Sequence, residues 1–163
     1  MSKVQIKVKD YGTIVVELDS NAAPLTVENF LELVRSGFYD GLTFHRIIDG
    51  FMIQGGDPDG NGTGGSGKNI KGEFVGNGIN NPISHTRGAI SMARSGMPNS
   101  ASSQFFIVHQ DSTFLDGQYA AFGTVTEGMD VVDRLASETP VTDNNGTVAP
   151  GKKPVIETIT VLD

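Results

Sequence analysis

Short apolar–polar alternation, repeated along most of the chain, is the feature that most restricts what this sequence can fold into. In VQIKVKD the apolar residues Val4, Ile6 and Val8 share one face of an extended segment, which is the period of a half-buried strand. Similar β-prone runs predict further strands over residues 13–19, 42–48, 51–55, 88–93, 104–109, 120–125 and 155–162. The chain is therefore expected to be mainly β, because patterns of period two do not pack as helices.

Two segments carry the helical period instead. Apolar residues recur at i, i+3, i+4 and i+7 from Val27 to Val34, Pro24 fits the first turn, and Gly37 fits the end. Residues 129–136 repeat the period. Because the helices do not alternate with the strands, a doubly wound parallel sheet is disfavoured. We predict a closed eight-stranded antiparallel β-barrel, a size that side chains can fill, capped by the two α-helices.

Composition is that of one globular domain, expected to span residues 1–163, with 37% apolar and 19% charged residues. A net charge of −7 argues against binding to nucleic acid or to an anionic membrane, because both depend on clustered Lys and Arg. The N-terminal segment lacks the apolar run of a signal peptide, and no run approaches the ~18 apolar residues of a membrane helix. We expect a cytoplasmic protein, with a monomer as the default.

A glycine-rich loop, GNGTGGSGKN, is the strongest nucleotide-binding candidate. Its glycines match G-x-G-x-x-G from Gly60, and most of the phosphate-loop pattern G-x-x-x-x-G-K from Gly62 to Lys68. However, Asn69 stands where Ser or Thr should hold magnesium, and both motifs need a strand before and a helix after them. No helical period follows, so a surface loop is the favoured interpretation.

Metal and nucleophile signals are weak. The chain has no cysteine, and His45, His85 and His109 lack the spacing of paired metal ligands. No serine occupies G-x-S-x-G. We therefore predict no metal and no cofactor.

The segment LTFHRIIDGFMIQGGD contains the most informative cluster of side chains. It sets Arg46 and Gln54 close in sequence to Phe51 and Met52. A buried core explains each large apolar residue taken alone, but a guanidinium is costly to bury unless it is paired, which places Arg46 at a rim. An apolar patch rimmed by one Arg and one Gln suits a ligand with an apolar ring and a carbonyl.

Five motifs in this chain closely resemble the cyclophilins, a family of peptidyl-prolyl cis-trans isomerases. They are FHRIIDGFMIQGGD, GNGTGG, SMARSG, SQFFI and FLDG, in the family's order and spacing over nearly the whole chain. SMARSG is similar to the single-domain bacterial branch, because the common eukaryotic form has Asn where Arg94 stands. The family fold is an eight-stranded antiparallel barrel capped by two helices, in agreement with the pattern of strands and helices above.

The resemblance implies a role for each matching residue. Arg46 stands at the catalytic arginine, with His45 beside it and Gln54 at the amide that orients the substrate carbonyl. The other matching positions form the substrate site: the proline pocket at Phe51, Met52, Phe106 and Leu115, the groove for preceding residues at Ala93, Arg94, Ser95 and Gln104, its edge at Gly62, and the rim at Phe114 and Tyr119. Phe114 replaces a tryptophan and Tyr119 a histidine, so weaker binding of cyclosporin-type inhibitors is expected.

The activity implied by the resemblance is isomerisation of X-Pro bonds in peptides and in unfolded or folding proteins, without a cofactor. Two alternatives from other classes remain open at this point. The same groove could hold proline-containing segments without catalysis, although the set of Arg46, Gln54 and Phe106 favours an enzyme. A nucleotide-binding protein using residues 60–68 would require ATP-dependent protection from unfolding.

Overall fold

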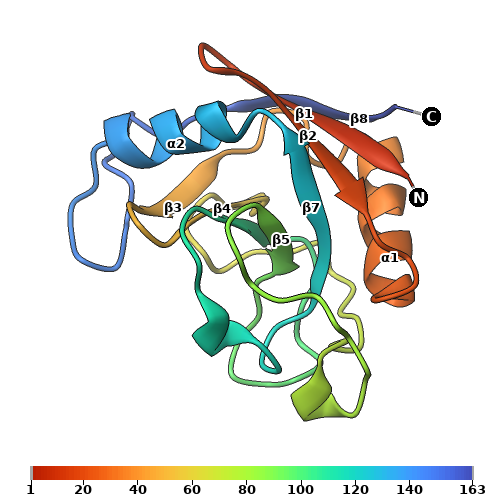
Figure 1. Ribbon diagram of the computed structural model, residues 1–163. Helices are drawn as coiled ribbons and strands as arrows, with labels where there is room; N and C mark the ends of the chain where they lie inside the picture. Colours follow the sequence, from red (N-terminus) through yellow and green to blue (C-terminus); the bar gives the residue numbers. More distant parts are fainter. Residues whose placement is uncertain (1, 163) are drawn as a thin grey trace.

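A computed structural model describes residues 2–162, and the strands of this part of the chain form one antiparallel sheet of eight strands (Figure 1). The strands are β1 (Lys3–Val8), β2 (Gly12–Leu18), β3 (Phe44–Ile48), β4 (Met52–Gly55), β5 (Ala89–Met92), β6 (Phe105–Val108), β7 (Ala121–Glu127) and β8 (Ile156–Val161). Each predicted strand is present, and the boundaries differ by at most a few residues. The mainly β class is confirmed.

The sheet is an open half-barrel, so the predicted closed barrel is wrong. The strand order β3-β4-β6-β5-β7-β2-β1-β8 leaves β3 and β8 as edges. The regions around the starts of these two strands are joined by an isolated bridge between Thr43 and Val155 and by hydrogen bonds of Ile156 with Gly41 and Leu42. Pro154 accepts a hydrogen bond from the Phe44 N–H at 3.0 Å, but proline has no N–H to donate in return. A continuous ladder therefore does not form across this gap.

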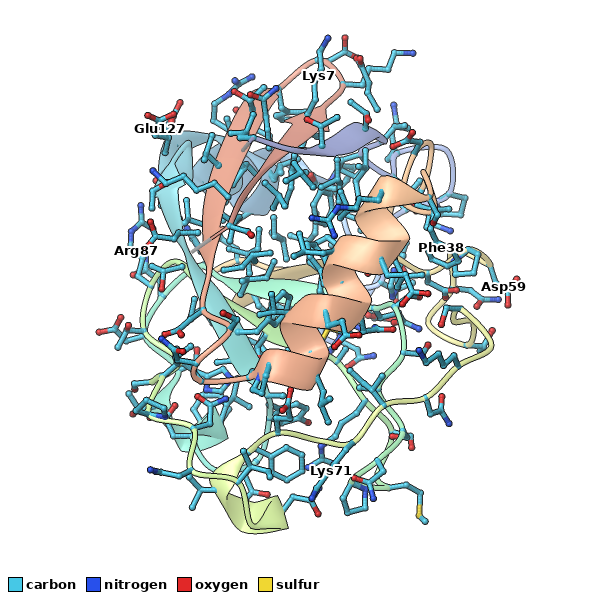
Figure 2. The ribbon with its side chains drawn as sticks, turned by 90° about the vertical axis from the view of Figure 1, so that its right-hand side faces the viewer. Lys7, Phe38, Asp59, Lys71, Arg87 and Glu127 are labelled. Carbon is cyan, nitrogen blue, oxygen red and sulfur yellow. The ribbon has the colours of Figure 1, made fainter. Side chains whose placement is uncertain are left out.

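Two α-helices, α1 (Pro24–Arg35) and α2 (Met129–Glu138), lie at opposite sides of the sheet (Figure 1). Helix α1 begins at Pro24, as predicted, and Gly37 follows its end with φ 75°, a left-handed conformation that glycine adopts without strain. Its buried stripe includes Val27, Phe30 and Val34. Figure 2 shows α1 lying across the interior, and short 3₁₀ turns are added at η1 (Val75–Asn77) and η2 (Thr113–Leu115).

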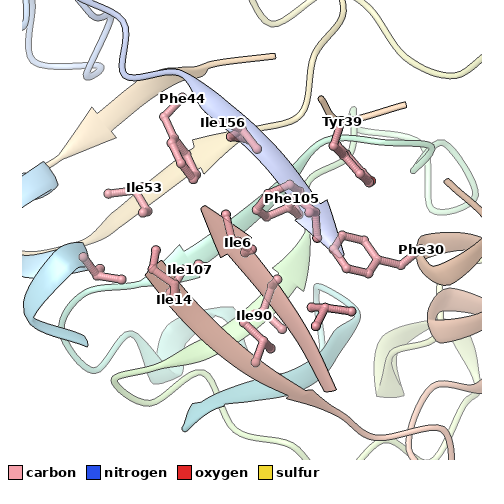
Figure 3. Packing of buried hydrophobic residues seen from close by; sticks show 14 of the residues in the cluster. Ile6, Ile14, Phe30, Tyr39, Phe44, Ile53, Ile90, Phe105, Ile107 and Ile156 are labelled. Carbon is pink, nitrogen blue, oxygen red and sulfur yellow. The ribbon is translucent and has the colours of Figure 1, made fainter. Parts of the chain in front are cut away.

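Apolar side chains are buried on both faces of the middle of the sheet. In β6, Phe105 and Ile107 belong to an interior cluster, whereas Phe106 and Val108 belong to a smaller cluster on the outer face with Met52. Alternate residues of a strand point to opposite faces, so this continuous apolar run reflects burial on both sides. Figure 3 shows the aromatic rings that meet in the interior cluster, namely Phe30, Tyr39, Phe44 and Phe105.

The long segment between β4 and β5 is tied to α1 by a buried carboxylate. Glu73 is 2% exposed, and its Oε1 accepts hydrogen bonds from the Thr26 N–H at 2.6 Å and the Thr26 hydroxyl at 2.7 Å. The N-cap residue of α1, Ala23, makes no side-chain cap. Glu73 therefore satisfies a free N–H of the first helical turn from a distant segment, and its charge complements the positive end of the helix dipole.

We expect Glu73→Gln to lower the free energy of unfolding by about 1–3 kcal/mol, because the buried helix N–H loses a charged acceptor. Urea denaturation measures this change. Glu28→Gln, on the exposed side of α1, makes the same charge change and should stay within about 0.5 kcal/mol of the parent. Equal effects of the two substitutions would show that the contact between Glu73 and Thr26 does not stabilise the fold.

Candidate functional site

Three neighbouring strands place Arg46, Gln54 and Phe106 in one row on the outer face of the sheet. Arg46 pairs opposite Gln54 between β3 and β4, and Gln54 pairs opposite Phe106 between β4 and β6. Directly opposite residues of antiparallel strands have Cβ atoms roughly 4.5–5.5 Å apart. The row therefore brings a cation, an amide and an aromatic ring together from distant parts of the sequence.

A shift of register in β3 determines where Arg46 points. The pairing with β4 shifts between Phe44 and Arg46, and Phe44 belongs to the interior cluster. In a regular strand residues i and i+2 share a face, so Arg46 would follow Phe44 into the core. A bulge redirects the side chains that follow it, and here it leaves the guanidinium on the outer face beside Gln54.

A chain of hydrogen bonds fixes the Arg46 guanidinium. Its Nε donates to the Asn145 carbonyl at 2.8 Å and one terminal nitrogen donates to the Asn145 side-chain oxygen at 3.1 Å. The other terminal nitrogen donates to Gln54 Oε1 at 3.2 Å, Gln54 donates to Gln104 at 3.0 Å, and Gln104 donates to the Gly64 carbonyl at 2.9 Å. All of these acceptors are neutral, so the guanidinium is held in place without a compensating carboxylate.

Beside Arg46 lies a small hollow of about 110 Å³, here called the apolar pocket. Its walls come from β3, β4, β6, η2 and the segments beside them, and its lining residues are Arg46, Phe51, Met52, Gln54, Ala93, Arg94, Phe106, Leu115 and Tyr119. The Tyr119 ring meets Phe106 edge-on, with centroids 5.8 Å apart. Nine of the residues singled out from the sequence therefore surround one hollow.

A second hollow of about 220 Å³, here called the polar pocket, adjoins the first. The two share Gln54, Ala93 and Arg94. The remaining lining residues of the polar pocket are Gly62, Thr63, Gly64, Ser95, Ser100, Ser102 and Gln104. The sequence-based candidates Gly62, Ser95 and Gln104 thus line one pocket, which adjoins the apolar pocket at Gln54.

Arg94 contacts aromatic rings between the two pockets. Its guanidinium lies 4.9 Å from the centre of the Phe74 ring and 4.8 Å from that of Tyr119, and it donates to the Gln118 carbonyl. Stacking of this kind is favourable because the aromatic face is electronegative. Arg94 therefore supports Tyr119 as well as lining the site.

Phe114 is a sequence candidate whose side chain points largely to solvent. It is 72% exposed and lines neither pocket. Its ring centroid is 5.6 Å from that of Phe51, which does line the apolar pocket. Phe114 therefore extends the apolar surface outward from the rim.

His45 is nearly buried, at 6% exposure, and within residues 2–162 neither ring nitrogen has a hydrogen-bond partner. Gly62 passes over it with φ 96°, and a side chain at Gly62 would meet the imidazole Nε2 at 3.8 Å. Burial lowers the pKa of His45, with Asp57 opposing that effect. The imidazole is therefore neutral at pH 7 and lies beneath the loop that carries Gly62.

Three residues that the sequence analysis did not assign to the site, His85, Ser91 and Asp116, form a hydrogen-bonded group beside the Phe106 ring. The His85 ring stacks on Phe106 with centroids 6.0 Å apart, and its nitrogens lie 2.8 Å from Asp116 Oδ1 and 2.9 Å from the Ser91 hydroxyl. Ser, His and Asp in this order match a nucleophilic triad, but Ser91 is 0% exposed and cannot reach a substrate. The group therefore positions Phe106. No local sequence pattern predicted this group.

The described residues contain no group of three or more His, Asp or Glu side chains that could hold a metal ion. From residue 2 to residue 162, no helix has the length and apolar character needed to cross a bilayer. The walls of the apolar pocket also carry no carboxylate, Ser or Thr hydroxyl or imidazole. The apolar pocket therefore combines apolar walls with the guanidinium and amide groups of Arg46, Arg94 and Gln54.

Comparisons with known proteins identify the family of the chain. Residues 3–161 match the model of the cyclophilin type peptidyl-prolyl cis-trans isomerase family. The chain is 48% identical over 129 residues to peptidyl-prolyl cis-trans isomerase B of Bacillus subtilis, covering 79% of this chain and 87% of that one. It is 47% identical over 126 residues to a peptidyl-prolyl cis-trans isomerase of Helicobacter pylori, covering 76% and 74%.

A solved structure extends the similarity to the whole fold. The crystal structure of a cyclophilin type peptidyl-prolyl cis-trans isomerase of Cryptosporidium parvum, in the presence of the dipeptide Ala-Pro, matches 99% of both chains with a TM-score of 0.85 and 32% identity. The chain belongs to the cyclophilin family and is a peptidyl-prolyl cis-trans isomerase. The resemblance inferred from the motifs is confirmed, and the non-catalytic module is not favoured.

Stability should fall as the pH is lowered from about 7 to about 5.5, because burial lowers the pKa values of His45 and His85. In the unfolded chain histidine titrates near pH ~6.5. Below that pH the unfolded state binds protons that the folded state does not, so this contribution is present above ~6.5 and is lost on acidification. Carboxyl groups with a lowered pKa, such as Asp57 and Asp116, lower the stability only when they are protonated, below about pH 5.

Melting temperatures at several pH values across this window measure the effect. His85→Gln keeps polar groups near Asp116 and Ser91 but does not titrate, so it should reduce the dependence of melting temperature on pH. A parent protein whose melting temperature is constant between these pH values would contradict the burial of neutral imidazoles.

Proposed function

We propose that Arg46 catalyses isomerisation by donating a hydrogen bond to the prolyl nitrogen of a substrate whose proline ring fills the apolar pocket. The supporting observation is that the Arg46 guanidinium uses only some of its N–H donors in hydrogen bonds within the protein. Arginine has about five N–H donors, and three hydrogen bonds from Arg46 go to Asn145 and Gln54. One N–H on each terminal nitrogen is therefore left for a substrate, in a position that neighbouring residues have already fixed.

The physics of the X-Pro bond explains why such a donor accelerates the reaction. Rotation has a barrier of ~18–20 kcal/mol because it breaks amide resonance. In the twisted state the nitrogen becomes pyramidal and exposes a lone pair, which the planar ground states lack. A donor aimed at that lone pair stabilises the twisted state more than either ground state, which is the requirement for catalysis.

The other candidates divide between the two pockets under this proposal. Phe51, Met52, Phe106, Leu115 and Tyr119 hold the proline ring still. Gln54 orients the carbonyl side of the substrate, and Ala93, Arg94, Ser95, Gln104 and Gly62 bind the residues that precede proline. His45 shapes this site from beneath the loop at Gly62. A relative solved in the presence of Ala-Pro supports proline-containing peptides as ligands.

We propose further that the protein acts as a cytoplasmic monomer on unfolded or folding proteins, without metal or cofactor. The chemistry of isomerisation supports the absence of a metal or cofactor, because no covalent bond is made or broken and neither a nucleophile nor a nucleotide is needed. A cysteine-free chain is compatible with a reducing compartment.

Arg46→Ala should lose about 10²–10³ in kcat, which is the usual effect of removing one preorganised donor, and it should remain folded. Arg46→Lys should also lose most of its turnover. Lysine keeps the charge but lacks the planar guanidinium, which donates to Asn145 and Gln54 at the same time. A protease-coupled or NMR exchange assay on an Ala-Pro peptide, with thermal melting alongside, measures both effects.

The exposed Arg35 at the end of α1 provides the control, and Arg35→Ala should keep parental turnover. If Arg46 only braces the fold, Arg46→Ala would melt early and Arg46→Lys would be nearly normal. A folded Arg46→Ala with more than about a tenth of parental kcat/KM, a loss of under ~1.4 kcal/mol, would remove Arg46 from the catalytic role.

Phe114→Trp should tighten inhibition by cyclosporin while peptide turnover stays within a few-fold. Phe114 is exposed beside Phe51, and an indole there adds an N–H donor that phenylalanine cannot supply. Inhibitor titrations of the parent and the variant test this expectation. Equal inhibition of the two proteins would mean that Phe114 does not stand at the rim position assigned to it.

A further inference from the structure

A third hollow, here called the cationic cavity, adjoins both pockets of the substrate site. It has a volume of about 660 Å³ and lies between the loop at residues 60–62 and the segment 142–153. It shares Arg46 and Gln54 with the apolar pocket, and Gln54 and Gly62 with the polar pocket. A peptide bound across Arg46 therefore has room for a flanking side chain in this cavity.

The charges that face the cationic cavity have one sign. Arg46 and Lys153 line it, and none of the residues that line it is Asp or Glu. Lys153 is half-buried, and its Nζ donates to the Gly60 carbonyl at 2.5 Å. Among the described residues, neither Arg46 nor Lys153 has a carboxylate within salt-bridge distance, whereas Lys7, Arg87 and Arg134 each have one.

This arrangement is unusual for the composition of the chain, which has 19 acidic and 12 basic residues. Two half-buried cations facing one hollow repel each other, and a nearby carboxylate would relieve that repulsion. Asn61, Thr142 and Asn145 add uncharged polar groups to the lining. The cavity therefore combines two positive charges with polar groups and no carboxylate, and this lining suits an anion.

Two carboxylates close in sequence to the lining residues, Asp57 and Asp143, accept hydrogen bonds from backbone N–H groups. Asp57 is 1% exposed and accepts from the N–H groups of Asp59, Asn61 and Gly62. Asp143 accepts from the N–H groups of Asn145 and Thr147, and it lines a separate hollow beside Ile47 and Ile48. Neither carboxylate lines the cationic cavity.

We propose that the cationic cavity is a further subsite that binds an anionic side chain of the substrate close to the isomerising proline. Lys153 and Arg46 provide the charge, and Asn61 and Asn145 provide neutral contacts. The inference rests on the proposed function, because it requires the proline ring to lie in the apolar pocket. Glutamate, aspartate and phosphorylated serine share the required chemistry.

A paired peptide series tests this subsite. Each pair carries Glu or Gln at one of the three positions before or after an Ala-Pro bond. At low salt, Glu at one of these positions should raise kcat/KM over Gln by about two- to five-fold, which is the range of a partly exposed ion pair. The gain should appear in KM, because the contact is equal in ground and twisted states, and it should shrink in high salt. Phosphoserine at the same position distinguishes a preference for phosphate from one for carboxylate.

Two neighbouring lysines provide matched variants. Lys153→Gln keeps a donor for the Gly60 carbonyl and removes one of the two charges, so the ratio of Glu to Gln turnover should fall well below the parental ratio. Lys153→Arg should retain the preference. Lys152, which is exposed and does not line the cavity, undergoes the same charge change in Lys152→Gln, and that variant should keep the parental ratio.

Each outcome bears on one of the two proposals. Equal turnover of the Glu and Gln peptides at all positions, with normal turnover of the neutral peptides, overturns the subsite and leaves the proposed function intact. A ratio of Glu to Gln turnover that is undiminished in Lys153→Gln, or that falls equally in Lys152→Gln, also overturns it. Failure to turn over any proline peptide would instead contradict the proposed function.

Discussion

The pairing of β4 with β3 on one side and β6 on the other is the constraint on which the site depends. It sets Arg46, Gln54 and Phe106 in one row, and the register shift before Arg46 turns the guanidinium outward. A slip of one residue would exchange the faces of a strand, carrying Gln54 into the core and Ile53 into the site. The interior cluster, which Ile53 and Phe105 help to fill, therefore also maintains the geometry of the outer face.

The two cations of the site, Arg46 and Lys153, both have neutral hydrogen-bond acceptors as their partners. Arg46 is held by Asn145 and Gln54, and Lys153 by the Gly60 carbonyl. A carboxylate in either place would hold the cation as firmly but would weaken its attraction for a substrate, since nearby opposite charges compensate each other. Backbone carbonyls and amides fix position while leaving the full charge available. This is why a chain of net charge −7 can still present a positively charged candidate site.

Sequence periodicity predicted the strands and helices correctly, but the predicted closure of the sheet into a barrel was wrong. The alternation in β1, the apolar run of β6 and the Pro24–Gly37 limits of α1 are local properties, and the structure has all three. Whether β3 meets β8 depends on two segments more than 100 residues apart. There Pro154 cannot donate to a ladder, so the sheet stays open. Among site residues, motifs identified those around the pockets, but Asn145, His85 and Lys153 carry no local signal of their part in it.

The sequence by itself determined the chemistry that the site contains: two arginines, two glutamines and a set of large apolar residues, several of them on strands whose period is two. That follows because strand alternation decides which neighbours share a face. Tertiary structure alone decided which distant groups complete the site. Asn145 reaches Arg46 across 99 residues, and Lys153 reaches Gly60 across 93. These contacts come from loops, whose paths follow from how the half-barrel packs and not from any pattern in their own residues.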